Sequence, residues 1–93
     1  MYIIEVTDER WILIKDQFEI GDAVTGVVVH KSPFGDWIDI GAGCSCLLEI
    51  IVMKDLTPEI YRSGEYNPVG STVKATIVGF RDENKQIYLS QTL

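Results

Sequence analysis

The sequence predicts a small all-β barrel that forms most of a single domain. Its 93 residues suit one domain, because independent domains usually have about 100–150 residues. The apolar share of 46% and the charged share of 24% are ordinary for a globular protein. From Gly21 onward, short apolar runs alternate with turn signals, which is typical of a small barrel or sandwich. The length excludes architectures that need roughly 200 residues or more.

The first two strands are expected on either side of a proline turn. Residues 23–30 are rich in β-branched side chains, and the run ends at Lys31-Ser32-Pro33 because proline cannot donate to a strand ladder. Residues 37–40 alternate, with Ile38 and Ile40 predicted to face inward. The outward positions of this second strand are Trp37 and Asp39.

The third strand is expected over residues 46–50, where Cys46, Leu48 and Ile50 would face inward. Gly41-Ala42-Gly43 is interpreted as the bend before it, with Cys44 as a turn residue. Residues 57–67 contain Pro58 and Gly64 and are expected to form a connecting loop with one helical turn.

The last two strands are predicted over residues 73–77 and 86–90, joined by the polar turn 81–85. The inward positions are Val73, Ala75, Ile77, Ile87 and Leu89, and the outward positions of the last strand are Gln86, Tyr88 and Ser90. Five short strands with a longer link between the third and fourth favour the OB-fold, a partly open five-stranded barrel. An SH3-like barrel is the alternative.

Residues 1–20 are expected to form an N-terminal extension to a barrel domain of residues 21–93. Trp11, Ile14 and Phe18 have the spacing of an amphipathic helix that begins near Thr7. The same stretch also fits a hairpin of residues 2–6 and 11–15. The sequence leaves both structures open.

Composition limits the function classes. The longest apolar runs, residues 11–14 and 50–53, are far shorter than the ~20 residues of a membrane span, so no membrane association is expected. Cys44 and Cys46 are separated by one residue, which favours free thiols and a cytoplasmic location. A net charge of −6 argues against sequence-blind attraction to nucleic acid.

No enzymatic activity, metal site or cofactor is expected. His30 is the single histidine, and no nucleophile is indicated beside it. The two cysteines fall short of the four ligands of a structural zinc site. We interpret Cys46 as a core residue.

A ligand of such a barrel is expected on the outer face of the second and third strands. Phe34 and Trp37 would give that face an aromatic platform, on which each stacked base is worth ~1–3 kcal/mol. In the alternative interpretation, Phe34 plugs the barrel end and Trp37 packs under the N-terminal segment.

Five motifs in order give the chain a resemblance to a known family. They are Gly21-Asp22-x-Val24-x-Gly26-x-Val28, Phe34-Gly35-x-Trp37-Ile38-Asp39-Ile40, Leu47-Leu48, Val69-Gly70-x-x-Val73-x-Ala75 and Ile87-x-Leu89-Ser90. Together they resemble the RNA-binding repeat of ribosomal protein S1 over about residues 20–91. The resemblance implies an OB-fold that binds single-stranded RNA or associates with the ribosome.

The resemblance also implies an RNA-binding site. Phe34 and Trp37 match the family's two aromatic positions, and Asp82 matches its acidic turn residue. Glu49 and Gln86 stand where the family often has histidine and arginine, so modest affinity is expected. The full predicted set is completed by the phosphate contacts Lys31, Lys74, Arg81 and Lys85, with His30 and Tyr88 nearby.

The second hypothesis is an acidic protein-interaction module, immunity-like or regulatory, that has lost RNA binding. Its partner would be a basic protein surface. The apolar anchors would be Trp37, Phe34, Leu47 and Tyr88, ringed by Glu49, Asp39 and Asp36.

Overall fold

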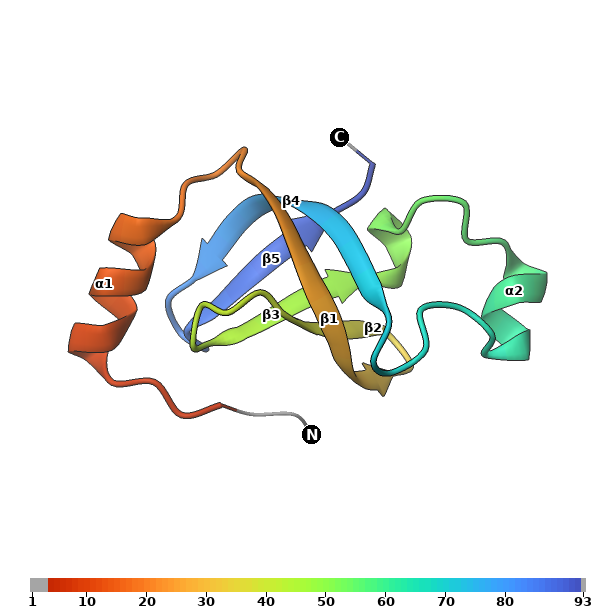
Figure 1. The fold of residues 1–93 in the computed structure, drawn as a ribbon, viewed down its shortest axis with the longest axis horizontal. Coiled ribbons are helices and arrows are strands. Elements are labelled where there is room, and N and C mark those ends of the chain that lie inside the picture. Colours follow the sequence, from red (N-terminus) through yellow and green to blue (C-terminus); the bar gives the residue numbers. More distant parts are fainter. Residues whose placement is uncertain (1–3, 93) are drawn as a thin grey trace.

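A computed structural model describes residues 4–92 and shows a closed barrel with the strand order β1-β2-β3-β5-β4 (Figure 1). Strands β3 and β5 pair in parallel and the other neighbours are antiparallel. This confirms the predicted five-stranded all-β barrel. The strand bounds are β1 Ala23–Ser32, β2 Gly35–Asp39, β3 Ser45–Glu49, β4 Thr72–Arg81 and β5 Gln86–Ser90.

The barrel interior is filled by the side chains that strand alternation predicts. Ile38, Cys46, Leu48, Ile77 and Ile87 are each at most 2% exposed and belong to one apolar cluster. Each pair of cross-strand partners turns to the same side of the sheet, so the alternation of one strand fixes that of its neighbour. The inward face was therefore readable from the sequence.

Ser90 and Cys44 are more buried than expected. Ser90 was predicted to face outward, but it is 3% exposed and its Oγ accepts a hydrogen bond from the backbone N of Thr92 at 3.1 Å. Cys44 lies in the bend before β3, as predicted, yet it is 4% exposed and part of the core cluster. Alternation turned Ser90 outward and gave Cys44 no direction, so the burial of both side chains was decided by tertiary packing.

A β-bulge interrupts each of the two long strands. In β1 the register with β2 shifts between Val28 and His30, and in β4 the register with β5 shifts between Ile77 and Gly79. A bulge bends its strand and increases the local twist. The bends allow β1 and β4 to pair with each other at one end and with β2 and β5 at the other, which closes the barrel.

The N-terminal segment is a helix, α1 (Asp8–Gln17), which decides between the two predicted alternatives. Thr7 is its N-cap, and the Thr7 side chain accepts a hydrogen bond from the backbone N of Arg10 at 3.2 Å. Trp11 and Ile14 are buried and join the barrel core. Residues 2 and 3 of the alternative hairpin lie outside the described residues.

The link between β3 and β4 contains a 3-10 helix, η1 (Ile50–Val52), and the short helix α2 (Pro58–Ser63), which corresponds to the predicted helical turn. α2 lies at the end of the barrel opposite α1 (Figure 1). The Tyr61 hydroxyl donates to the carbonyl oxygen of Pro33 at 2.8 Å and so ties α2 to the β1–β2 turn. Within residues 4–92, no helix has the length and apolar character needed to cross a membrane.

Candidate nucleic-acid interface

A groove of about 780 Å³ runs over the outer face of β1, β2, β3 and β5, between the β1–β2 turn and the β4–β5 turn. This is the face on which the sequence placed a ligand. We call it the stacking groove. Its lining residues are His30, Lys31, Ser32, Pro33, Phe34, Trp37, Leu47, Arg81, Glu83, Asn84, Gln86 and Tyr88.

A row of cross-strand partners forms the floor of the stacking groove. His30 of β1 pairs with Trp37 of β2, Trp37 with Leu47 of β3, and Leu47 with Tyr88 of β5. The bulge in β1 brings His30 opposite Trp37, because it skips one residue after Val28. Four residues from distant parts of the chain thereby share one surface.

The two predicted platform aromatics differ in exposure. Phe34 is 50% exposed and its ring meets the Trp37 ring edge-on, with centroids 6.2 Å apart. Trp37 lies in the groove floor as predicted but is only 5% exposed, so the expectation of a bare ring is wrong for this residue. The N-terminal helix places Trp11 edge-on to Phe80, with the ring centroids 6.1 Å apart.

The opposite end of the groove holds a second aromatic, Tyr88, with a cation above it. The Arg81 guanidinium lies 4.6 Å from the centre of the Tyr88 ring. Gly79, the partner of Tyr88 on β4, carries no side chain, and a Cβ there would meet nothing within 4 Å. At this end of the floor, the β4 partner of Tyr88 therefore contributes no side chain beside the ring. A guanidinium stacked on tyrosine is itself a flat surface for a base.

The charges around the groove nearly cancel. Arg81 is opposed by Glu83, which lines the groove beside the neutral amides of Asn84 and Gln86. Glu49, expected to repel phosphate here, pairs with Gly35 and does not line the groove. The stacking groove therefore offers aromatic faces and hydrogen-bonding groups to a ligand. It has little net positive charge with which to attract a phosphate backbone. Glu83 and Asn84 were not predicted, because the register of the 81–85 turn decides where they point.

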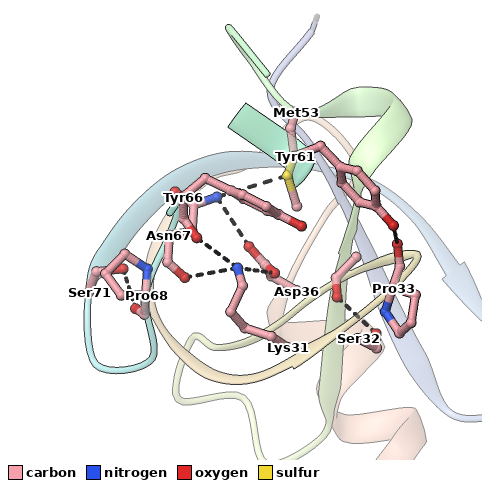
Figure 2. A network of polar contacts seen from close by, with 11 residues as sticks. Lys31, Ser32, Pro33, Asp36, Met53, Tyr61, Tyr66, Asn67, Pro68 and Ser71 are labelled. Carbon is pink, nitrogen blue, oxygen red and sulfur yellow. Dashed lines mark hydrogen bonds and ion pairs between the residues drawn. The ribbon is translucent and has the colours of Figure 1, made fainter. Parts of the chain in front are cut away.

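Lys31 lines the groove, but its ammonium is engaged within the protein (Figure 2). Its Nζ donates to Asp36 Oδ1 at 2.8 Å and to the backbone oxygens of Tyr66 and Asn67 at 2.8 and 3.1 Å. An ammonium has three protons, and these acceptors use all of them. The predicted phosphate contact at Lys31 is thus a structural cation.

Asp36 is also corrected, because it lies inside the barrel end and not on the rim. The side chain is 0% exposed, and Asn67 Nδ2 donates to its Oδ2 at 3.2 Å. Asp36 is two residues from the inward-facing Ile38, so strand alternation turns it inward as well. The proposed acidic ring around the apolar anchors loses this member.

Two of the predicted site residues attach helix α1 to the barrel. Asp82 Oδ1 accepts hydrogen bonds from Lys15 Nζ and Trp11 Nε1, both at 2.8 Å. These donors, Lys15 first, hold the pKa of Asp82 below its ordinary value. Lys85 Nζ lies 3.1 Å from Asp8 Oδ1. Neither Asp82 nor Lys85 lines the stacking groove.

Lys74, another predicted phosphate contact, lies on a different face. It is on β4 opposite Thr25 of β1, on the side of the barrel away from β2 and β3. The predicted set is therefore divided: Phe34, Trp37, Lys31, His30, Arg81 and Tyr88 share the stacking groove, and Lys74, Asp82 and Lys85 lie elsewhere.

The two thiols are free and buried. The hydrogen bond with Cys44 and then burial raise the pKa of Cys46, which keeps it protonated. Among residues 4–92 no group of three or more His, Cys, Asp or Glu side chains is placed to hold a metal ion.

Comparisons with known proteins agree with this geometry. The model of the family described as S1 RNA binding domain matches residues 17–91. The small ribosomal subunit protein bS1 of Staphylococcus aureus is 34% identical over 77 residues, which are 83% of this chain and 19% of that protein. The chain thus spans about a fifth of the length of this relative.

Solved structures show the same fold. The solution structure of GSP13 from Bacillus subtilis superposes with a TM-score of 0.66 at 23% identity, over 81% of this chain and 56% of that one. The crystal structure of the a/eIF2alpha-aDim2p-rRNA complex from Pyrococcus horikoshii gives 0.62 at 21% identity, over 78% and 44%. With its family model matched over most of its length and its barrel shared by these structures, the chain belongs to the S1 RNA binding domain family.

Proposed function

We propose that this chain binds single-stranded RNA in the stacking groove, with modest affinity and through the faces of unpaired bases. The observation that carries the proposal is the half-exposed ring of Phe34 at one end of a 780 Å³ groove. An exposed aromatic ring beside a groove suits a base, since every base has a π-face. Membership of the family supports RNA as the ligand.

Two stacking positions for bases are proposed within the groove. The first is the ring of Phe34, held edge-on by Trp37. The second is the Arg81–Tyr88 pair, where a base stacks on the guanidinium or on the phenol ring. Buried Trp37 supports the first of these positions, and the Gln86 amide offers hydrogen-bonding groups to base edges.

The setting of this activity is proposed from the relatives. One is a ribosomal protein and another was solved in a complex with rRNA, which supports association with ribosomal or other structured RNA at its unpaired segments. Reduced, buried Cys44 and Cys46 suit the cytoplasm.

The test is a fluorescence titration of labelled oligo-uridine and oligo-adenine with wild-type protein and with Phe34→Ala. The variant should lose about 1–3 kcal/mol of binding free energy, or about 5- to 150-fold in Kd, because it removes one stacking surface. Its melting temperature should fall only slightly, because the ring is half exposed.

The matched control is Ile20→Ala, which truncates a side chain that is 66% exposed and does not line the groove. Ile20→Ala should bind both oligonucleotides as the wild type does. If Phe34→Ala also binds as the wild type does, or if the wild type binds neither oligonucleotide, the proposal is wrong. Specific capture of a basic protein, without any RNA binding, would point to the interaction-module hypothesis instead.

A further inference from the structure

A second groove, of about 710 Å³, lies over the outer face of β1 and β4. These two strands lie side by side in the barrel (Figure 1), and the chain after β5 passes beside η1. We call it the lysine groove. Its lining residues are Ala23, Val24, Thr25, Lys54, Asn67, Thr72, Val73, Lys74, Ala75, Thr76 and Gln91.

The composition of the lysine groove is unlike that of the whole chain. The chain has a net charge of −6, yet the groove lining contains two lysines and no carboxylate. Both lysines are exposed. The ion pairs found among residues 4–92 engage Lys15, Lys31, Arg62 and Lys85, and neither Lys54 nor Lys74 takes part in them.

Strand register surrounds Lys74 with hydroxyl groups. Lys74 pairs with Thr25, and Thr76 and Thr72 are two residues away on either side along β4. Because side chains alternate along a strand, Thr72, Lys74 and Thr76 share the outer face. An ammonium among three hydroxyl donors is a suitable environment for phosphate oxygens.

Gln91 fixes the two lysines relative to each other. Its Oε1 accepts a hydrogen bond from the backbone N of Lys54, and its Nε2 donates to the backbone oxygen of Lys74, each at 3.0 Å. The backbone N of Gln91 donates in turn to the Val52 oxygen at 2.9 Å. The backbones of two lysines that lie 20 residues apart in sequence are thus joined at one groove by a single amide side chain.

From these observations we infer that the lysine groove binds backbone phosphates of the RNA strand whose bases occupy the stacking groove. The inference rests on the proposed function. In this arrangement the two grooves bind different parts of the RNA. The nearly neutral stacking groove binds bases, and the lysine groove supplies the cations for phosphates that the stacking groove lacks. Lys74 thus keeps its predicted role as a phosphate contact. It has this role together with Lys54, on a different face of the barrel from the stacking groove.

Reaching both faces requires RNA beyond the length that fills the stacking groove. OB-folds engage about 4–16 nucleotides, so an oligomer of about 4 should occupy the stacking groove alone and one of about 16 both grooves. Each engaged lysine adds about −0.7 to the slope of log K against log salt for a single strand. Two lysines give about −1.4, which is about a sevenfold loss of affinity between about 50 and about 200 mM salt.

The experiment compares wild-type protein with the double variant Lys54→Gln/Lys74→Gln, using oligo-uridine of about 4 and about 16 nucleotides across that salt range. For the longer oligomer the slope should become shallower by about 1.4. Binding of the shorter oligomer should not change. Amide NMR shifts of Thr25 and Gln91 should move on adding the longer oligomer and not on adding the shorter one.

The matched control is Arg10→Gln/Arg62→Gln, which removes the same charge from two exposed side chains outside both grooves. It should leave the slope unchanged. An unchanged slope in the lysine variant, an equal loss in the control, or an equal loss for the shorter oligomer overturns this inference, while Phe34-dependent binding would leave the proposed function standing. Absence of any RNA binding by the wild type overturns both.

Discussion

A variant of Lys31 tests whether this residue is a structural cation or an RNA contact. The sequence predicted that Lys31 contacts phosphate, whereas in the structure its ammonium binds groups within the protein. Replacing it by Lys31→Met removes the ammonium that neutralises Asp36, whose side chain is 0% exposed. It also leaves the backbone oxygens of Tyr66 and Asn67 without their lysine donor. The remaining partner of the buried carboxylate is the Asn67 amide at 3.2 Å.

The magnitude follows from this burial. Breaking a buried ion pair by removing one partner costs about 3–5 kcal/mol. The lysine side chain is 26% exposed, so solvent screens part of the interaction and we expect the lower end, about 3 kcal/mol. For a domain of this size that lowers the melting temperature by roughly 12–24 °C. The salt slope of RNA binding should stay unchanged.

The assay is thermal and urea unfolding, with an RNA titration at several salt concentrations below the melting point of the variant. Lys15→Met is the matched control: it breaks an ion pair whose Asp82 side chain is 69% exposed, a type of pair worth about 0–1 kcal/mol. Combining Lys31→Met with Asp36→Asn should recover part of the loss, because no unpaired buried charge remains. The structural assignment is refuted if Lys31→Met melts like the wild type while its salt slope weakens by about 0.7.

Three further predictions concern other parts of the fold. Trp37→Ala should destabilise the protein by about 3–5 kcal/mol in urea unfolding, because this ring is 5% exposed; an unchanged midpoint would contradict its burial. Gly26→Ala should also lower the urea midpoint, since a Cβ there would lie 2.6 Å from the Asp39 carbonyl oxygen, whereas the control Gly79→Ala should not. The Asp82 contact with helix α1 should weaken under acid: the folded pKa is depressed, so its stabilisation is present above the unfolded value and is lost as pH falls through the folded one. Followed by tryptophan fluorescence, the loss of stability as pH falls below the ordinary aspartate range should therefore be smaller in Asp82→Asn than in the wild type, and identical acid profiles would refute the role of this contact.

The strands were predictable because their information is local. Alternation along 37–40, 73–77 and 87–89 separates inward from outward positions, and the barrel interior uses those same residues. Helix α1 was harder to predict, because the spacing of Trp11, Ile14 and Phe18 competed with a hairpin pattern. The core contacts of Trp11 and Ile14 show how the helix is held.

The candidate site was predictable in its aromatics and only partly in its charges. Phe34, Trp37 and Tyr88 reach the expected face because each is fixed by its strand or by the turn between β1 and β2. The prediction that the Trp37 ring is exposed was wrong, because outward orientation does not determine how closely the neighbours of a large ring pack around it. Glu83 was missed because its direction depends on the turn.

The sequence by itself determined the strands of the barrel and the aromatic face, because side-chain alternation and turn residues act over a few neighbouring positions. Only the tertiary structure decided which cations are available. Lys31 meets Asp36 and the 66–67 backbone, while Lys54 and Lys74 come together across Gln91. Charges interact through space, and the segments that bring them together are distant in the chain.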